Sequence, residues 1–173
     1  MNSILIISDS HGWEKQLQDI RKNQSHVKEA IHCGDSELNE DSPFLKDYQV
    51  VKGNCDWTAD FPNEIIFEYG GLTFLITHGH LFDIKSSLMK LEYRAQEVGA
   101  DIICFGHSHV AYAENINGRL FINPGSIRLP RQFPEGSYAK LNWTSSEDIQ
   151  LEFFNIKGEE ITNLPYRNKF SLK

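Results

Sequence analysis

Seven side chains that could bind a metal ion stand directly after five predicted strands. They are Asp9, His11, Asp35, Asn54, His78, His107 and His109. One aspartate or histidine in such a place is usually part of a turn or of a solvated surface, but five strand ends with the same feature indicate a shared role. Loops at the carboxyl ends of neighbouring strands converge at one edge of a sheet. We therefore expect these side chains to meet in one site.

The chemistry of this set points to two divalent ions. Three oxygen donors and four imidazoles are too many ligands for one four-coordinate zinc ion. Shared between two ions, with Asp35 as a bridge, they leave positions for water and for substrate oxygens. Two dications outweigh the two aspartates, so the site would be positively charged and would suit an anionic phosphate. Nitrogen and oxygen donors without thiolate fit Mn²⁺, Fe, Co²⁺, Ni²⁺ or Zn²⁺.

Short strands and helices alternate in the part of the chain that carries these residues. The unbroken apolar run at residues 4–7 predicts a strand over residues 4–8 that is buried on both faces. A helix is expected after it, with Trp13, Leu17 and Ile20 on its buried face. Further strands are predicted at residues 30–33, 49–51, 64–68, 72–77 and 102–105.

The second half of the chain contains one clear helix and then only strands. The helix is predicted at residues 85–98, where apolar residues recur at steps of four and three and Gly99 provides a stop. Strands follow at 138–143 and 149–153, and Asn117-Gly118 is a strong hairpin turn. Together these elements predict one α/β domain over residues 1–173, with two sheets packed face to face and helices outside.

Composition excludes several classes of protein. Lys and Arg number 17 against 24 Asp and Glu, and the formal net charge of −7 argues against nucleic-acid wrapping and against docking on an anionic membrane. The longest unbroken apolar runs have four residues, whereas a membrane-spanning helix needs about 20. Three cysteines without a C-x-x-C pair, and no secretory signal at the start, predict a cytoplasmic protein.

Five short motifs carry the predicted ligands in a fixed order. They are Asp9-Ser10-His11, Gly34-Asp35, Gly53-Asn54-Cys55-Asp56, Thr77-His78-Gly79-His80 and Gly106-His107-Ser108-His109. Their order and spacing resemble those of the calcineurin-like metallophosphoesterases. The later run Asn123-Pro124-Gly125-Ser126, followed by Arg128, narrows the resemblance to the small bacterial and archaeal branch of YfcE and YsnB type.

The resemblance implies a four-layer α-β-β-α sandwich that binds two metal ions and hydrolyses phosphoesters. It assigns one ion to Asp9, His11, Asp35 and His109, and the other to Asp35, Asn54, His78 and His107. A hydroxide that bridges the ions would attack phosphorus, while Asp35, Asn54 and His78 act by positioning the metals and the phosphate. Mn²⁺ is the metal that we expect first.

One position departs from the larger members of this family. They carry Gly-Asn-His-Glu where this chain has Gly53-Asn54-Cys55-Asp56, and their histidine is assigned to protonation of the leaving oxygen or to phosphate binding. A thiol with an ordinary pKa of about 8.5 is a poor substitute for such an acid. The departure predicts that diesters and good leaving groups are the preferred substrates.

Other residues beside the motifs are candidate substrate contacts. They are Cys55, Asp56, His80, Arg128 and Arg131. The two arginines could clamp a phosphate through bidentate hydrogen bonds, or they could be ordinary surface charges. His80 fits a substrate contact and a solvated loop equally well, whereas His32 is expected to be structural.

Two functions of different classes remain open. The first is a phosphoesterase, most simply a phosphodiesterase, that acts on a small phosphoester. The second is a noncatalytic metal-binding scaffold of the same fold. All seven ligand positions are filled, which favours catalysis. The sequence does not choose the substrate, and it leaves a homo-oligomer open.

Overall fold

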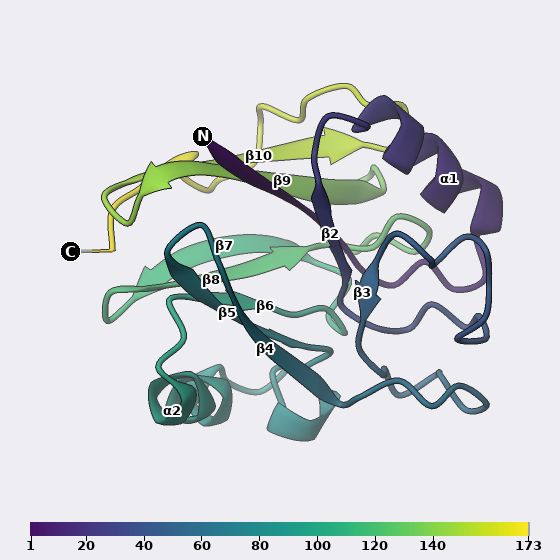
Figure 1. Ribbon diagram of the computed structural model, residues 1–173, viewed down its shortest axis with the longest axis horizontal. Helices are drawn as coiled ribbons and strands as arrows, with labels where there is room; N and C mark the ends of the chain where they lie inside the picture. Colours follow the sequence, from purple (N-terminus) through teal and green to yellow (C-terminus); the bar gives the residue numbers. More distant parts are fainter. Residues whose placement is uncertain (173) are drawn as a thin grey trace.

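The computed structural model describes residues 1–172, and in that part of the chain two β-sheets carry one α-helix each (Figure 1). In chain order the elements are β1 (Asn2–Ile7), α1 (Glu14–Asn23), β2 (Glu29–His32), β3 (Gln49–Val50), β4 (Glu64–Tyr69), β5 (Leu72–Thr77), the 3₁₀ helix η1 (His80–Phe82), α2 (Met89–Val98), β6 (Ile102–Cys104), β7 (Ala111–Ile116), β8 (Arg119–Pro124), β9 (Ser137–Ser145), β10 (Asp148–Asn155) and β11 (Lys169–Phe170).

Both sheets are mixed. The first has the strand order β11-β10-β9-β1-β2-β3, with β1, β2 and β3 parallel and β9 antiparallel to β1. The second has the order β4-β5-β6-β8-β7, with β5, β6 and β8 parallel and β4 and β7 antiparallel at its edges. Each parallel set ends its strands at one sheet edge, so the loops that carry the motifs lie together.

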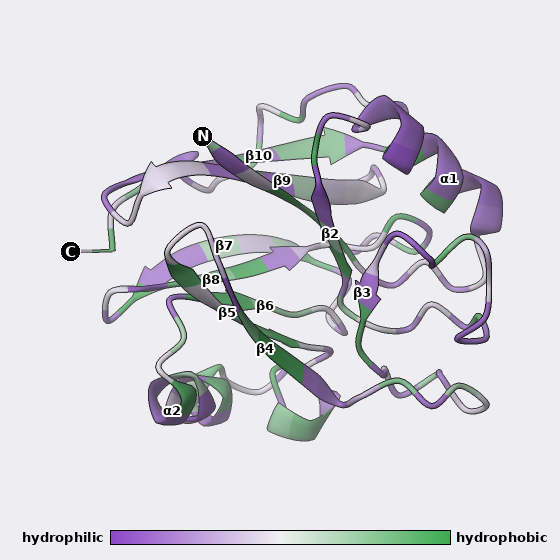
Figure 2. Cartoon of the chain, in the orientation of Figure 1, coloured by the Kyte–Doolittle hydropathy of each residue, from purple (hydrophilic) through white to green (hydrophobic). Residues whose placement is uncertain are grey.

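The strand β1 shows why the layers form. Ile4 and Ile6 belong to the hydrophobic core between the two sheets. Leu5, which points the other way, packs with Leu17 and Ile20 of α1. The predicted burial of this strand on both faces is therefore confirmed, as is the apolar face of α1, whose remaining surface is mostly hydrophilic (Figure 2).

The second helix covers the outer face of the second sheet. Leu91 and Ala95 of α2 pack against Leu75, Ile103 and Phe121. Figure 1 shows α1 and α2 on opposite outer sides of the two sheets. The predicted α-β-β-α order of layers is confirmed.

The start of this helix was predicted wrongly. It begins at Met89, four residues later than the apolar spacing predicts. Asp83 has a left-handed backbone conformation, and the Ser87 hydroxyl accepts the backbone N–H of Met89, so a turn precedes the helix. Ile84 and Leu88 still pack in the layer of α2, which is why their spacing resembled a helical stripe.

The two ends of the described chain share one sheet. The strand β9 pairs with both β1 and β10, so the last hairpin completes the sheet that carries the first motif. Within residues 1–172 no helix has the length and apolar character that crossing a membrane requires.

Candidate metal centre

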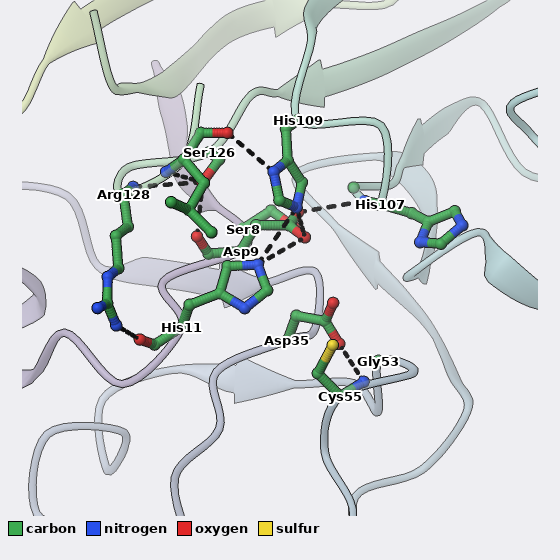
Figure 3. Close-up of polar contacts among 12 residues, drawn as sticks. Ser8, Asp9, His11, Asp35, Gly53, Cys55, His107, His109, Ser126 and Arg128 are labelled. Atoms are coloured by element: carbon green, nitrogen blue, oxygen red, sulfur yellow. Dashed lines mark hydrogen bonds and ion pairs between the residues drawn. The ribbon is translucent and has the colours of Figure 1, made fainter. Parts of the chain in front are cut away.

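The loops after β1, β2, β3, β5 and β6 meet at one edge of the sandwich. Backbone N–H groups of Asp9, His11 and Gly106 donate to the carbonyls of Gly34, Asp35 and His78, each at 3.0 Å. The N–H of His107 also donates to Oδ2 of Asp9 at 3.1 Å, which joins the second sheet to the first (Figure 3). The predicted ligands are thus carried by loops that are bonded to one another.

Five of the predicted ligands have a left-handed backbone conformation. Their φ angles are 54° at Asp9, 42° at His11, 56° at Asp35, 67° at His107 and 60° at His109. Residues other than glycine rarely adopt this conformation, although Asp, Asn and His tolerate it best. Several such residues in one place are typical of a functional site, because ordinary loops avoid the strain.

The carboxylate of Asp9 lies at the centre of the group. It is fully buried, and its Oδ2 accepts hydrogen bonds from the Ser8 hydroxyl at 2.5 Å and from His107. Its Oδ1 has no well-formed hydrogen bond among the described residues, although three imidazole Nε2 atoms surround it. These belong to His109 at 3.0 Å, His11 at 3.7 Å and His78 at 3.9 Å.

The other ring nitrogen of each of these histidines is already occupied. His11 Nδ1 contacts Glu37 Oε1 at 2.8 Å, His109 Nδ1 the carbonyl of Leu129 at 2.8 Å, and His78 Nδ1 the carbonyl of Cys33 at 2.7 Å. Because these acceptors take the proton on Nδ1, the Nε2 lone pairs point into the site. An oxygen acceptor behind each imidazole is the arrangement that metal-binding histidines use.

The pKa values of His11 and Asp9 reflect how strongly the two groups interact. The neighbouring carboxylate of Asp9, outweighing burial and helped by Glu37, raises the pKa of His11 to about 9. Burial alone would raise the pKa of Asp9, but the surrounding histidines hold it well below its usual range. The Nε2 atoms of His11 and His109 lie 3.2 Å apart, close enough to share one cation.

A second group of ligands adjoins the first. Oδ2 of Asp35 lies 3.2 Å from His78 Nε2, and Oδ1 of Asn54 lies 3.1 Å from the same atom. The other oxygen of Asp35 accepts the N–H of Cys55 at 2.7 Å, so Oδ2 is its atom that faces the site. Burial opposes ionisation of Asp35, yet His78 lowers its pKa overall.

These residues fit divalent cations. Ligand atoms of Asp9, His11 and His109 lie within 4.8 Å of one another, and so do those of Asp9, Asp35 and His78. The site holds anionic carboxylate oxygens and imidazole lone pairs that face inward. A bound cation would stabilise them, because the site does not hold enough protons to do so. A further group, His11, Glu37 and Cys55, reaches the more exposed side.

His107 and His80 lie at the border of this cluster. The His107 ring is 5.1 Å from the His78 ring, whereas its backbone N–H, rather than the ring, contacts Asp9. Burial, His78 and Lys85 lower the pKa of His107 to about 4. The His80 ring is 5.4 Å from that of His78, and its Nδ1 has no hydrogen-bond partner within residues 1–172.

Asp56 has a different place from the one predicted. Its buried carboxylate accepts the backbone N–H groups of Asp35, Gly53 and Glu37 at 2.7 to 2.8 Å. A carboxylate that is buried and occupied in this way holds the loops together, so the predicted substrate contact of Asp56 does not agree with the structure. Half-buried Cys55 does face the site, and burial together with Asp35 raises its pKa to about 12.

The two arginines also differ from each other. Arg128 donates to the carbonyl of His11, and its guanidinium lies 5.8 Å from the Trp13 ring centre, so it braces the first loop. Arg131 is exposed, as Arg128 is, and its backbone N–H donates to the carbonyl of His109 at 2.9 Å. Of the pair, Arg131 has the side chain that is more available to a substrate.

The glycines directly before the ligands leave room for close contacts between the loops, a role that was not predicted from the sequence. A Cβ atom at Gly53 would lie 2.0 Å from Oδ1 of Asp35, and one at Gly106 would lie 2.0 Å from the Ser8 hydroxyl. The repeated Gly-Asp, Gly-Asn and Gly-His pairs in the sequence could have indicated this close packing. The role of Glu37 also went unpredicted, because only the fold brings its carboxylate to His11.

Taken together, the two-sheet sandwich and its cluster of buried aspartates and histidines define a phosphoesterase-type metal protein. A family model for the calcineurin-like phosphoesterase superfamily domain matches residues 2–146, and the chain belongs to that family.

Individual relatives agree with this assignment. The probable metallophosphoesterase YsnB of Bacillus subtilis is 50% identical over 166 residues, covering 95% of this chain and 98% of the relative. The phosphodiesterase MJ0936 of Methanocaldococcus jannaschii is 30% identical, covering 69% and 81%. A crystal structure of a predicted phosphoesterase from Streptococcus pneumoniae superposes with a TM-score of 0.92 at 38% identity, covering 98% and 97%.

Proposed function

We propose that this protein is a phosphodiesterase that uses two divalent metal ions to hydrolyse a small phosphoester. The observation that carries the proposal is the buried Oδ1 of Asp9, which has no well-formed hydrogen bond among residues 1–172 and faces three imidazole Nε2 atoms. An anionic oxygen surrounded by lone pairs is stable only with a cation or a proton among them. Membership of the calcineurin-like family supports a phosphoester substrate.

The residues divide between two ions. Asp9, His11, Asp35 and His109 would hold the first, and Asp35, Asn54, His78 and His107 the second. Asp35 is the proposed bridge, with Oδ2 as its available oxygen. Nitrogen and oxygen donors favour Mn²⁺, with Zn²⁺, Ni²⁺, Co²⁺ and Fe as alternatives.

The chain positions the substrate for a reaction that bound ions make possible. When bound, such ions polarise phosphoryl oxygens and lower the pKa of water. Oxygen acceptors hold three of the imidazoles in place through hydrogen bonds from Nδ1. The acceptors are the carboxylate of Glu37 for His11, the carbonyl of Leu129 for His109 and the carbonyl of Cys33 for His78. Asn54 is exposed, so its side chain can reach both a metal and a phosphate oxygen.

Preference for diesters with good leaving groups follows from the residue at position 55. Cys55 is bonded through its N–H to Asp35 and stands where larger relatives carry a histidine. With a thiol there, the leaving oxygen must depart without an imidazolium donor at that position. A phosphodiester with an acidic leaving alcohol meets this requirement best.

We also propose that residues 1–173 form one domain that acts in the cytoplasm. The pairing of β1 with β9 supports the first point. Cys33 and Cys104 are unpaired and buried in the core between the sheets, which suits a reducing compartment.

Hydrolysis of bis(p-nitrophenyl) phosphate with and without metal tests the function. Activity should disappear on chelation, return with Mn²⁺ and return poorly with Mg²⁺. Asp41→Asn, an exposed change away from the site, serves as the control for Asp35→Asn. Two tightly bound ions without hydrolysis of any phosphoester would favour the noncatalytic scaffold, and hydrolysis by metal-free protein in excess chelator would contradict both.

A further inference from the structure

An apolar groove of about 330 Å³ lies beside the candidate metal centre. Ile84, Leu88, Phe105, Val110 and Tyr112 supply most of its lining. They come from the turn before α2, from the loop between β6 and β7, and from β7 itself, so the groove opens on the side of the second sheet. A larger cavity of about 570 Å³ between β7 and the segment 165–171 has none of the predicted ligands in its wall.

The groove borders the loop that carries two of the proposed metal ligands. Ser108, which lines it, stands between His107 and His109 in the chain. The hydroxyl oxygen of Ser108 accepts the side-chain amide of Asn123 at 3.0 Å and the N–H of Val110 at 3.2 Å. This wall is therefore held rigidly, within one residue of two proposed ligands.

The opposite lip carries a positive charge. Lys85 lines the groove and is exposed, and no carboxylate of residues 1–172 forms an ion pair with it. It is also one of the charges that act on His107. A cation at the edge of an apolar surface attracts an anion that has an apolar part.

The floor of the groove is aromatic. Phe105 is buried, and its ring lies 6.2 Å from the Tyr112 ring at an interplanar angle of 62°. Ligand sites of this kind combine mostly apolar walls with a few polar groups, and a volume near 300 Å³ is enough for one ring system. Flat apolar groups gain most from such a surface, because they bury area without losing many rotamers.

We propose that this groove binds the organic group of the phosphoester, and that this group is flat and apolar, such as an aryl ring. The inference rests on the proposed function, since it takes the metal centre as the place of the phosphorus atom. Lys85 then lies near the ester's negative charge, and Leu88 lies against the ring.

Binding of two phosphonates that are not hydrolysed tests the groove. We expect Zn²⁺-loaded protein to bind phenylphosphonate about tenfold more tightly than methylphosphonate in calorimetry. In methyl NMR spectra, phenylphosphonate should shift the signals of Ile84, Leu88 and Val110, and methylphosphonate should leave them in place. Equal affinities, or equal shifts with both compounds, would overturn the proposal.

A matched pair of variants locates the effect. Leu88→Ala should lower the phenyl-to-methyl affinity ratio by about fourfold, the factor expected for loss of contact with one methylene. Leu81→Ala changes the same residue type in the nearby helix η1, where Leu81 is 59% exposed and outside the groove, and it should keep the ratio. A ratio that is unchanged in Leu88→Ala would overturn the proposal.

The same experiments separate this inference from the proposed function. Hydrolysis of diesters without a preference for the phenyl compound would overturn the groove alone. A phenyl preference without hydrolysis of any phosphoester would support the groove and overturn the proposed function.

Discussion

The two halves of the candidate metal centre differ in how firmly the protein holds them. In the first half, Asp9 is fully buried, and the Nδ1 atoms of His11 and His109 are fixed by oxygen acceptors. In the second half, only His78 has such an acceptor. Asn54 is exposed there, and the contact of the His107 ring is with another ring.

From this difference we infer that one of the two proposed metal positions is formed before a metal arrives, whereas the other is completed on binding. Preorganised ligands lose little conformational freedom, so they bind more tightly than ligands that must be ordered first. We therefore expect two unequal affinities in a metal titration, with the first ion held by the half around His11 and His109.

Removal of the charge of Asp35, the proposed bridge, should have the largest effect. Asp35→Asn should lower kcat/KM more than about 10³-fold and reduce both metal affinities, which exceeds the roughly 10- to 100-fold loss typical of outer residues. Asp9→Asn should release the first ion and spare the second. Metal content of the purified variants decides between them. The reverse pattern would make Asp9 the bridge, as its place in both ligand groups allows.

Restoring the acid missing from the second half should come next in size. Cys55→His should accelerate esters with poor leaving groups by up to about 10²- to 10⁴-fold and change nitrophenyl esters little. The measurement is kcat/KM against leaving-group pKa at matched metal occupancy, with Cys55→Asn as the control of similar size. A flat dependence in the unmodified protein would show that a proton is already supplied, and His80 would then be the first group to test.

A smaller effect on metal affinity is expected from Glu37, which contacts His11 in the first half of the centre. Glu37→Gln keeps an acceptor for His11 Nδ1 but removes its charge, so the first ion should bind about 10- to 100-fold more weakly. Calorimetric titration with Mn²⁺ gives the two affinities separately. Glu40→Gln, an exposed change three residues away, should alter neither. A change confined to the second ion would contradict the division into halves.

The last effect is on folding stability and not on metal binding. It concerns His32, which is bonded to the loops that carry Asp9 and Asp35. Its Nε2 contacts the Ser10 hydroxyl at 2.8 Å, and its Nδ1 accepts the N–H of Gly34 at 3.2 Å. Burial lowers the pKa of His32 from 6.5 to about 4, so on acidification the unfolded chain takes up this proton first. The stability associated with neutral His32 is complete above pH 6.5 and falls between pH 6.5 and 4, by up to about 3 kcal/mol.

Urea unfolding of the metal-free protein at pH 7.5 and pH 5 measures this contribution. His32→Gln should reduce the loss of stability on acidification, whereas His26→Gln at an exposed position should leave it unchanged. The same pH dependence in both variants would assign the loss to other groups.

The sequence predicted the sandwich because its information is local. The unbroken run of β1 and the Asn117-Gly118 turn each fix an element without reference to the rest of the chain. The start of α2 was missed because Ile84 and Leu88 pack like helical residues from within a turn. The spacing of apolar residues indicates which side chains are buried, and side chains in a turn can be buried as well as those in a helix.

The candidate metal centre could be predicted only in part from the sequence. Residue type and strand ends were enough to gather the ligand candidates, but the carbonyls of Leu129 and Cys33 that orient two histidines have no counterpart in residue type. Asp56 was misread for a related reason. A carboxylate beside a motif looks the same in sequence whether it faces substrate or accepts backbone N–H groups.

The left-handed backbone at five ligand positions governs how this chain can change by mutation. Asparagine accepts that conformation at least as well as aspartate or histidine, and a single nucleotide change converts a codon of either one to asparagine. Such a replacement removes a carboxylate charge or an imidazole ligand and leaves the loop conformation intact. A β-branched replacement at Asp9 or His109 would damage loop and ligand together. Loss of metal binding with retention of the fold is thus a short evolutionary step for this architecture.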